Sequence, residues 1–546
     1  MKIVVVGSGF TGAVSACAIK IQCPDHEVVM IDSDRESKNV GFGESAPPHM
    51  QALLFEAFAV PEHRRREWLV DFLTGTKSTV KFNLRWKNFH GYEDDGYFSG
   101  IPDMASYHAM FEPTHTKKQL TNDIVFPDHE AYKIHDLWYE LYMQGRRSMK
   151  DFEADVNPLY WYSRNHSMVS HSSSAHESEK YFSLAPTMHV NSYTASDWIK
   201  KTYGHMLDEV IAASVDQIVA NEDGSVQKLI LNNNREVTGD LYIDCTGFRR
   251  MFANQFGHEL SPVNTKIKHD SCVVVANGYT ENIDQEMQPY TDGIGMQYGW
   301  TFSIPLIDKK SFGYVFDSSF IDADQALEEL ASLSNPATRV IDPLKLKWTP
   351  GAYKKTWNKN YVMMGLAAGF SDPFDANTIT INFHQIKQVI AGITGKLPME
   401  QAKISYSLNT WQFFELVAER VELHFGLAPR DTSDYWKRNH IIAEEKNLKE
   451  KVFEVLNRPQ HSLASHAAGK GKPYFAHLYL SESLYYGLDM SRRCRQSDPA
   501  LLDFAEEYFK SFNRLNKMRS EIAPSMRKWY AHNNIDLDQY IKFKKS

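Results

Sequence analysis

The chain has 546 residues, of which 42% are hydrophobic and 23% are charged. This composition is typical of globular proteins and excludes a disordered or collagen-like chain. A formal net charge of −8 argues against binding to a nucleic-acid backbone, and no run of about 18 uninterrupted apolar residues predicts a membrane span. The aromatic share of 13% indicates either a large core or aromatic walls around a site.

The five cysteines are scattered along the chain and form no C-x-x-C pair. Their odd number and spacing predict neither a disulfide scaffold nor a zinc site, and they favour the reducing cytoplasm. No signal peptide is expected, because the first residues already have the pattern of a strand and a glycine loop. His166, His171 and His176 recur in a serine-rich tract, but their spacing does not predict a metal site.

The N-terminus has the pattern of a β-α-β unit. Ile3–Val6 is a β-branched run that predicts a buried parallel strand, Ala13–Ile19 predicts a helix, and Val28–Ile31 predicts a second strand. The motif Gly7-x-Gly9-x-x-Gly12 lies between the first strand and the helix, and Asp32 ends the second strand.

The three glycines of this motif have distinct tasks. The first permits a tight turn, the second lets the backbone approach a pyrophosphate, and the third lets the helix pack closely on the strand. Asp32 is placed to accept a hydrogen bond from a ribose hydroxyl. We therefore predict a nucleotide cofactor; the alternative is a glycine turn in a cofactor-free fold of the same shape.

A later segment favours FAD over NAD as this cofactor. Gly239–Phe248 is a predicted strand that ends in Asp244 before a Thr-Gly turn, and it is similar to the strand that returns to the FAD in flavoprotein monooxygenases. The chain is also longer than an NAD dehydrogenase usually needs. A second G-x-G-x-x-G is missing, so a separate NAD(P)H domain is not evident.

Further strands are predicted where apolar and β-branched residues cluster, and helices where apolar residues recur at helical spacing. Strands are expected from Val215 on and at 229–231, 241–245, 272–276, 298–305 and 313–317. A helix is expected at 413–425, and another after Ser497-Asp498-Pro499, where the apolar series is Leu501, Phe504, Tyr508, Phe512, Leu515 and Met518. Residues 38–48, 162–178 and 465–473 are expected to be loops or linkers.

Five motifs, in order along roughly residues 1–490, point to one family. They are Val40–Pro47, Thr76–Phe82, Gly299–Pro305, Gly365–Asp375 and the stretch from His424 to Trp436. With these motifs the chain resembles the flavin-dependent halogenases of the tryptophan-halogenase type. The resemblance implies an α/β fold (α+β overall), namely an FAD-binding, Rossmann-like flavin monooxygenase fold with an added, mainly helical substrate lobe.

The resemblance also implies a domain organisation. Residues 1–90, 190–255 and 300–400 would form a discontinuous FAD-binding module. Residues 91–189 and 256–299 would be substrate-side insertions, and residues 401–546 would be the mainly helical C-terminal part of the substrate lobe. The length of the chain is then expected to reflect one elaborated flavin fold rather than several independent domains.

The implied activity is FAD-dependent halogenation. Reduced FAD, oxygen and a halide ion (bromide, chloride or iodide) would form hypohalous acid, which would halogenate an electron-rich aromatic of the indole or phenol type. The resemblance places the catalytic lysine at Lys77 and a second acid, normally glutamate, at Asp375. From the residues alone, Lys77 could be an ordinary surface lysine and Asp375 could be the N-cap of a following helix.

The resemblance implies further contacts. The halide would lie against the backbone of Asn377 and Thr378, where the family has a Thr-Gly pair, and the lost glycine predicts a preference for a larger, softer halide. Trp300, Phe302, Ile304 and Pro305 would line the passage of the oxidant. The FAD would contact Gly7, Gly9, Thr11, Gly12, Asp32, Gly43, Ser45, Val215, Asp244, Leu366 and Ile379.

The substrate contacts follow the family pattern least. Leu484 stands where the family has a tryptophan clamp, and Tyr97, Phe98 and His108 are candidates for the rest of the clamp. Two alternatives stay open, an FAD-dependent aromatic hydroxylase and a non-catalytic scaffold of the same fold. The expected partners are the small aromatic substrate and a separate NAD(P)H flavin reductase, with homo-oligomer formation left open.

Overall fold

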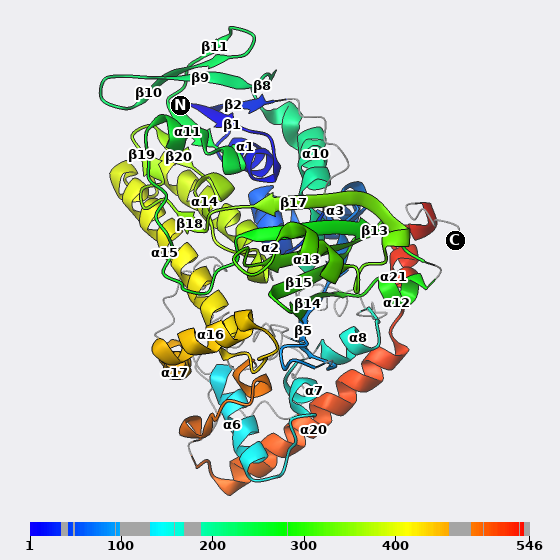
Figure 1. Cartoon of the computed structure of the whole chain (residues 1–546). Coiled ribbons are helices and arrows are strands. Elements are labelled where there is room, and N and C mark those ends of the chain that lie inside the picture. Colours follow the sequence, from blue (N-terminus) through cyan, green and yellow to red (C-terminus); the bar gives the residue numbers. More distant parts are fainter. Residues whose placement is uncertain are drawn as a thin grey trace. The chain divides into compact units, whose positions relative to one another are not determined.

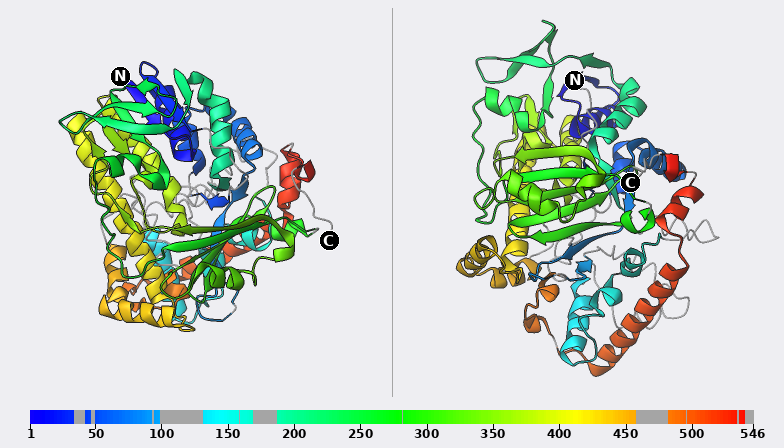
Figure 2. Two further views of the ribbon diagram at one scale, coloured as in Figure 1. Left: turned by 45° about the horizontal axis from the view of Figure 1, so that its top comes forward. Right: turned by 45° about the vertical axis from the view of Figure 1, so that its right-hand side comes forward.

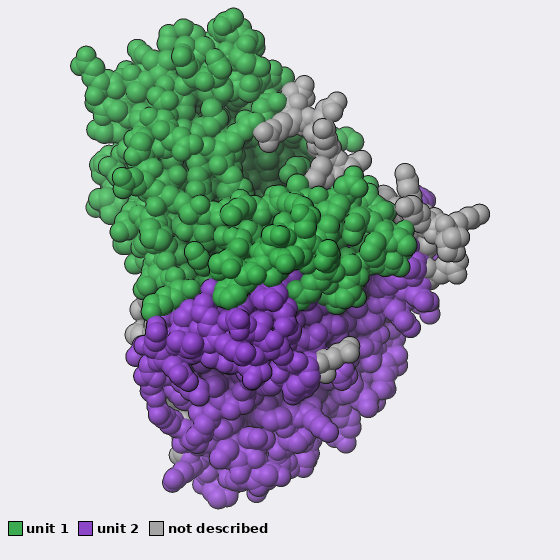
Figure 3. Space-filling view, in the orientation of Figure 1, with its two compact units in different colours: residues 1–79, 188–277, 315–422 green, residues 80–187, 278–314, 423–546 purple. Residues whose placement is uncertain are grey.

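The structure is a computed structural model that describes residues 1–33, 42–46, 50–92, 94–98, 131–157, 159–168, 187–280, 282–457, 482–494, 496–533 and 535–539. The chain divides into two compact units, which Figure 3 shows in different colours. Unit 1 comprises residues 1–79, 188–277 and 315–422, and unit 2 comprises residues 80–187, 278–314 and 423–546. The functional boundaries predicted from sequence stay a prediction, because the two units are defined by packing alone.

Unit 1 is built on a six-stranded sheet, labelled in Figure 1. Its strand order is β19 (Trp357–Asn358), β20 (Tyr361–Met363), β12 (Leu241–Asp244), β1 (Lys2–Val6), β2 (Glu27–Asp32), β8 (Glu209–Ala212). All neighbours pair in parallel except β19 and β20. The β-branched residues of β1 are buried, as expected for a strand covered on both faces.

The predicted β-α-β unit is confirmed, since α1 (Phe10–Gln22) connects β1 to β2. The other helices of unit 1 are α2 (Met50–Ala57), α3 (Arg65–Thr76), α10 (Ser192–Tyr203), α11 (Met251–Gln255), α13 (Ala323–Leu330) and α14 (Asn377–Ile393). Three short 3-10 turns contribute to the site described below: η3 (Gly247–Arg249), η5 (Gly365–Ala367) and η6 (Phe374–Ala376).

Smaller sheets complete unit 1. A three-stranded sheet of β9 (Val215–Ala220), β10 (Val226–Leu231) and β11 (Glu236–Val237) lies beside the main sheet in Figures 1 and 2, and its apolar side chains share a core with those of β1 and β2. The remaining pairs are β3 (Gly43–Ser45) with β7 (Thr187–Asn191), β13 (Ser271–Asn277) with β17 (Arg339–Lys347), and β18 (Gly351–Ala352) with β21 (Gly369–Phe370). Along the chain, β4 (Thr79–Lys81), β7, β16 (Lys310–Phe316) and α15 (Met399–Leu427) run from one unit into the other.

Unit 2 contains the strands β15 (Gly299–Pro305), β14 (Tyr290–Met296), β5 (Asn83–Lys87) and β6 (Tyr97–Phe98), which pair in this order. Its helices are α6 (Ala131–Met143), α7 (Phe152–Val156), α8 (Tyr160–Arg164), α12 (Ile283–Glu286), α16 (Asp434–Glu445), α17 (Leu448–Asn457), α20 (Pro499–Ile522) and α21 (Met526–His532). One core cluster joins α6, α7, α17 and α20 through buried side chains such as Trp138, Phe152 and Phe509.

The predicted strands and helices are confirmed where the structure describes them, but two of the predicted loops are wrong in part. Residues 43–45 form β3, because they pair with β7, and residues 162–164 belong to α8. The predicted strands correspond to β1, β2, β9, β10, β12, β13, β15 and β16, and the predicted helices to α1, α15 and α20. The expected loop 38–48 lies only partly within the described residues, where it contains β3, and most of 162–178 and all of 465–473 lie outside them. Among the described helices, none has the length and apolar character that crossing a bilayer requires.

Candidate functional site

The glycine loop of unit 1 has one open position. A Cβ on Gly7 (φ +105°) would lie 2.6 Å from the carbonyl oxygen of Cys245, and a Cβ on Gly12 would lie 1.9 Å from that of Gly7. A Cβ on Gly9 would meet nothing within 4 Å. The first and third glycines are therefore required by the fold itself, whereas the second borders free space.

Gly9 is also the N-cap of α1, and it supplies no side-chain hydrogen bond to the helix. The first amides of a helix need acceptors, and they carry the positive end of the helix dipole. Open space beside an N-terminus without a side-chain cap suits a phosphate group. These residues therefore fit the pyrophosphate of a dinucleotide such as FAD.

Asp32 lies at the end of β2 and is held by two neighbours. The Ser8 hydroxyl donates a hydrogen bond to one carboxylate oxygen, and Lys200 Nζ on α10 lies 3.0 Å from the other. Burial alone would lower the pKa of Lys200, but the hydrogen bond and charge of Asp32 outweigh burial and raise it. Lys200 was not predicted from the sequence, because it lies far from any glycine motif.

Asp244 is buried within its own turn. One oxygen accepts hydrogen bonds from the Thr246 backbone (2.9 Å) and hydroxyl (2.6 Å), and the other accepts from the Phe252 amide (3.1 Å). Burial raises the pKa of the Asp244 carboxyl, and these donors oppose the shift. The side chain thus fixes the Thr246-Gly247 turn at the carboxyl end of β12, next to the open glycine loop on β1.

Three of the predicted cofactor residues come from elements that meet beside α1. Thr11 lies on α1, Leu366 on η5 and Ile379 on α14, and α14 packs against both other elements. Gly365 has φ +61°, and a Cβ there would lie 2.9 Å from Thr11 Oγ1. Val215, at the start of β9, is half-buried against the core of the main sheet, close in sequence to Ala213, whose amide donates to the Asp32 carbonyl.

β3 carries the predicted FAD strap. Gly43 pairs with Asn191 and Ser45 with His189 on β7, while burial raises the pKa of the Glu44 carboxyl between them. β3 lies against η6, the turn that contains Asp375. The structure thus brings the predicted strap and the predicted second acid together.

Asp375 has a left-handed backbone (φ 56°, ψ 23°) just before α14. Arg420 Nε on α15 donates to its carboxylate at 3.0 Å, and both side chains are almost completely buried. The Arg420 guanidinium also lies 5.1 Å from the centre of the Phe374 ring. No sequence pattern pointed to Arg420, which is 45 residues away in the chain.

The predicted halide residues open a long helix. Asn377 and Thr378 are the first residues of α14, which extends over 17 residues. Their backbone amides therefore lie where the helix dipole favours an anion. The start of this helix is thus a place where an anion such as a halide is favoured.

Lys77 ends α3 in an unusual conformation. It is the C-cap residue, with φ 58° and ψ 29°, and its amide donates to the carbonyl groups of Leu73 and Thr74. A left-handed backbone is normally left to glycine at this position, because a Cβ makes it costly. The neighbours Thr76 and Ser78 are fully buried and share a hydrogen bond of 2.6 Å, which restrains the backbone on both sides of Lys77.

One turn of α10 connects the end of α3 to the glycine loop. The Thr194 hydroxyl donates to the Thr76 carbonyl, and the Ser196 hydroxyl donates to the Ser8 carbonyl, both at 2.5 Å. The residue before Lys77 and a residue of the glycine loop are thus anchored two positions apart on one helix. Sequence reasoning missed both hydroxyls, since single Ser and Thr residues carry no motif.

The residues predicted to line the passage of the oxidant belong to unit 2. Trp300 and Phe302 project from one face of β15, with ring centres 6.0 Å apart, and Trp300 lies 5.7 Å from Trp86 on β5. Glycines make room for the rings, because a Cβ on Gly293 would strike Trp86 and one on Gly313 would strike Phe302. Ile304 and Pro305 continue the strand and are buried.

The substrate candidates of unit 2 form an aromatic group. Tyr97 lies 4.4 Å from Tyr485, between ring centres, and Phe98 lies 5.1 Å from Tyr290. Leu484 is buried in the helical core, and His108 lies outside the described residues. A buried pair that the sequence did not predict, His424 and Glu482, adds a 2.9 Å contact between Nδ1 and Oε2.

The comparisons with known proteins agree on one family. A family model described as tryptophan halogenase matches residues 2–492. The chain is 21% identical over 461 residues to tryptophan 7-halogenase RebH of Lentzea aerocolonigenes, covering 83% of this chain and 81% of that protein. It is 22% identical over 546 residues to tryptophan 6-halogenase SttH of Streptomyces toxytricini, covering 97% and 98%.

Solved structures give the same result for the fold. The crystal structure of SttH from Streptomyces toxytricini matches with a TM-score of 0.79 at 20% identity, covering 97% of this chain and 99% of that one. BrvH, a flavin-dependent halogenase from Brevundimonas sp. BAL3, matches with a TM-score of 0.76 at 19% identity, covering 97% and 98%. The predicted fold class is thereby confirmed.

Proposed function

This chain belongs to the tryptophan halogenase family, whose members are flavin-dependent halogenases, and on that premise we propose that it halogenates an electron-rich aromatic small molecule of the indole or phenol type. When bound, reduced FAD supplies the electrons with which oxygen and a halide ion form hypohalous acid. In the halogenation step the halogen replaces a ring proton, and the proton leaves with the hydroxide of hypohalous acid as water. A hydroxylase would instead form its product without halide.

The observation that carries this proposal is the backbone of Lys77. A non-glycine residue is held in a left-handed conformation at a helix end only when its surroundings enforce it, and such strain is concentrated at functional sites. Here α10 enforces it through Thr194, and the same turn of α10 holds the glycine loop through Ser196. We assign Lys77 to hold hypohalous acid by a hydrogen bond, or to form a haloamine with it.

Asp375 is proposed to orient the oxidant or accept the ring proton. Aspartate is one methylene shorter than the glutamate of the family pattern, and its left-handed backbone and the Arg420 contact fix where its carboxylate lies. Arg420 is then a positioning residue, since it acts through Asp375.

The halide is proposed to bind at the N-terminus of α14, beside the amides of Asn377 and Thr378. The missing glycine restricts close approach by the backbone, so we expect bromide or iodide to be preferred over chloride. Competition between the three halides, read from the product masses, measures this preference; a clear preference for chloride would contradict it.

The supply of cofactor is proposed to come from a separate NAD(P)H flavin reductase, since only one G-x-G-x-x-G loop is present in the sequence. We place the reaction in the cytoplasm, in agreement with the cysteine pattern. The FAD-binding module is proposed to comprise residues 1–90, 190–255 and 300–400, with the rest of the chain on the substrate side.

The test is a product screen with reduced FAD from an added flavin reductase, oxygen, each halide in turn and a panel of indoles and phenols, read by mass spectrometry. Products whose mass follows the halide support halogenation, whereas a halide-independent gain of one oxygen supports the hydroxylase. Lys77→Ala is expected to lose the halogenated product. Lys201→Ala, which removes an exposed lysine of α10, is the matched control and should keep full activity.

A further inference from the structure

The long helix α20 of unit 2 has two apolar rows, and only one of them is packed. Leu502, Ala505 and Phe509 are buried in the core cluster that α20 shares with α6 and α7. The second row remains exposed: Phe504 is 43% exposed, Leu515 39%, Met518 58% and Ile522 83%. Four of the sixteen large apolar side chains that are exposed among the described residues thus lie on this one helix.

The exposed row has the spacing of a coiled-coil seam. Phe504, Tyr508, Ser511, Leu515, Met518 and Ile522 follow one another at alternating steps of four and three residues. This heptad spacing keeps side chains on a narrow stripe that faces a partner helix. Tyr508 is half-buried and stacks on Phe504 with ring centres 6.5 Å apart, so the row is continuous at its N-terminal end. A solvent-facing helix surface needs no such pattern.

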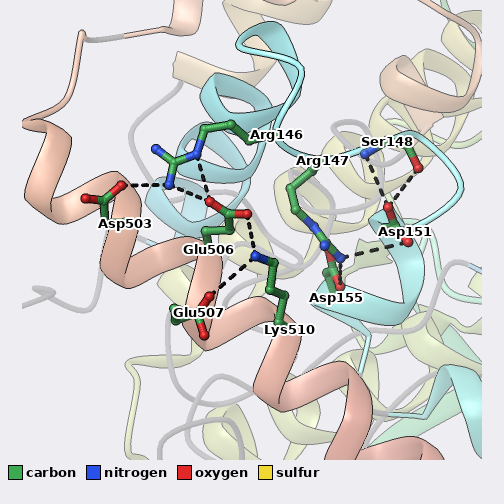
Figure 4. Close-up of polar contacts among 9 residues, drawn as sticks. All are labelled: Arg146, Arg147, Ser148, Asp151, Asp155, Asp503, Glu506, Glu507 and Lys510. Atoms are coloured by element: carbon green, nitrogen blue, oxygen red, sulfur yellow. Dashed lines mark hydrogen bonds and ion pairs between the residues drawn. The ribbon is translucent and has the colours of Figure 1, made fainter.

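The charges of α20 are divided along its length. Its first half carries Asp503, Glu506 and Glu507, and its second half carries Lys510, Arg514, Lys517 and Arg519 with a single acid, Glu521, in the last turn. Figure 4 shows how the acidic half is used within the unit: Arg146 contacts Asp503 at 2.7 Å, and Lys510 contacts Glu506 at 2.6 Å. Glu507 lies beside the seam, and its side chain is 75% exposed. Its contact with Lys510 is a long one, at 3.4 Å, so the carboxylate can also contact a second cation.

We propose that α20 is a self-association surface on which two copies of this chain pair in antiparallel orientation. The reversal places the acidic half of each helix against the basic half of the other, and it also opposes the two helix dipoles favourably. A parallel pair would place acidic against acidic and basic against basic. Charge complementarity therefore selects a second copy, reversed, as the occupant.

The heptad positions fix the register of this pair. In an antiparallel pair centred between Phe509 and Lys510, Phe504 meets Leu515 of the second copy and Tyr508 meets Ser511. The residues that flank the seam then place Glu507 opposite Arg514 of the second copy, and the two-fold symmetry makes each contact twice. The helix is about 36 Å long at 1.5 Å per residue, so the seam is small and we expect association at micromolar concentrations.

The first experiment measures mass against concentration by sedimentation velocity, using the full chain and the variants Leu515→Glu and Met518→Glu. The wild-type chain is expected to shift toward the dimer as its concentration rises, and each variant to weaken the dimer at least about tenfold. Ile404→Glu is the matched control, because Ile404 is an apolar residue of α15 that is 69% exposed and is not part of the seam. Exposed positions are chosen so that the variants fold, which circular dichroism checks.

A charge exchange tests the orientation. Glu507→Arg alone and Arg514→Glu alone are each expected to weaken the dimer by roughly threefold to tenfold, because each places like charges together at both ends of the seam. The double variant restores the opposite charges only in the antiparallel register and should recover the wild-type dissociation constant. A monomeric wild-type chain at every concentration, unchanged association in Met518→Glu, or no recovery in the double variant would overturn the proposal.

Discussion

The left-handed backbone at Lys77 makes a prediction about stability that is independent of the chemistry. Inside an ordinary helix, a protein with glycine is less stable than one with alanine at the same position by roughly 0.5–1 kcal/mol, because glycine loses more conformational freedom on folding. At φ 58° the Cβ of alanine keeps a penalty of about 1–2 kcal/mol that glycine does not have. Lys77→Gly should therefore unfold with a free energy about 1 kcal/mol higher than that of Lys77→Ala, and both variants should lose halogenation.

The matched pair is Asp71→Gly and Asp71→Ala, at an exposed position inside α3. There the usual order holds, and glycine should be the less stable variant by about 1 kcal/mol. Urea unfolding of the four variants gives the difference between the two sites, about 2 kcal/mol, in which errors of extrapolation largely cancel. If glycine is also the less stable residue at position 77, the left-handed conformation is not what limits stability there. If Lys77→Gly still halogenates, the role assigned to the lysine is wrong.

Three further predictions concern other positions of the chain. Gly12→Ala should lower the free energy of unfolding by at least about 3 kcal/mol, because its Cβ would clash with the backbone of Gly7. Gly9→Ala should change the free energy of unfolding by no more than about 1 kcal/mol, yet weaken FAD binding at least about tenfold, as measured by flavin fluorescence. Equal losses of stability in the two variants would contradict this. Arg420→Gln should cost about 3–5 kcal/mol in urea unfolding by leaving the Asp375 carboxylate without its charged partner, and adding Asp375→Asn should recover part of the loss. Burial raises the pKa of Glu153 to about 8, so the folded state favours the protonated carboxyl. Relative to Glu153→Gln, the wild-type chain should therefore lose stability as pH rises from about 4.5 to about 8. A difference in the free energy of unfolding between the two chains that stays constant across that range would refute the assignment.

The N-terminal β-α-β unit could be predicted because each residue there acts locally. The local conformation there follows from the residues themselves, namely the β-branched run, the three glycines and the acid at the end of the next strand. β1, α1 and β2 are accordingly present where they were predicted. The open space beside Gly9 and the two contacts of Asp32 could not be predicted in the same way. Of the two Asp32 contacts, the one with Lys200 depends on α10, because Lys200 is 168 residues away in the chain and α10 carries no motif of its own.

The same limit applies to α20. Its apolar spacing predicted a helix, and the helix is present. The spacing could not say which row would be packed, because two rows run along the helix within a few residues of each other. Tertiary packing buries Leu502 and Phe509 and leaves Phe504 and Met518 exposed, a choice that depends on α6 and α7 and not on the helix sequence.

Backbone strain gives a pointer to function that residue type alone does not give. Among the described non-glycine residues with positive φ, several lie in exposed turns, where a left-handed residue is easily accommodated, such as Ala59, Lys359 and Asn447. Lys77 and Asp375 are each next to a fully buried side chain, as are Asn88 and Asn447, but asparagine tolerates this conformation better than lysine does. A fold that only needed to end these segments could use glycine, at a gain of about 1 kcal/mol. That the two positions carry an ammonium and a carboxylate instead is what the proposed chemistry requires of them.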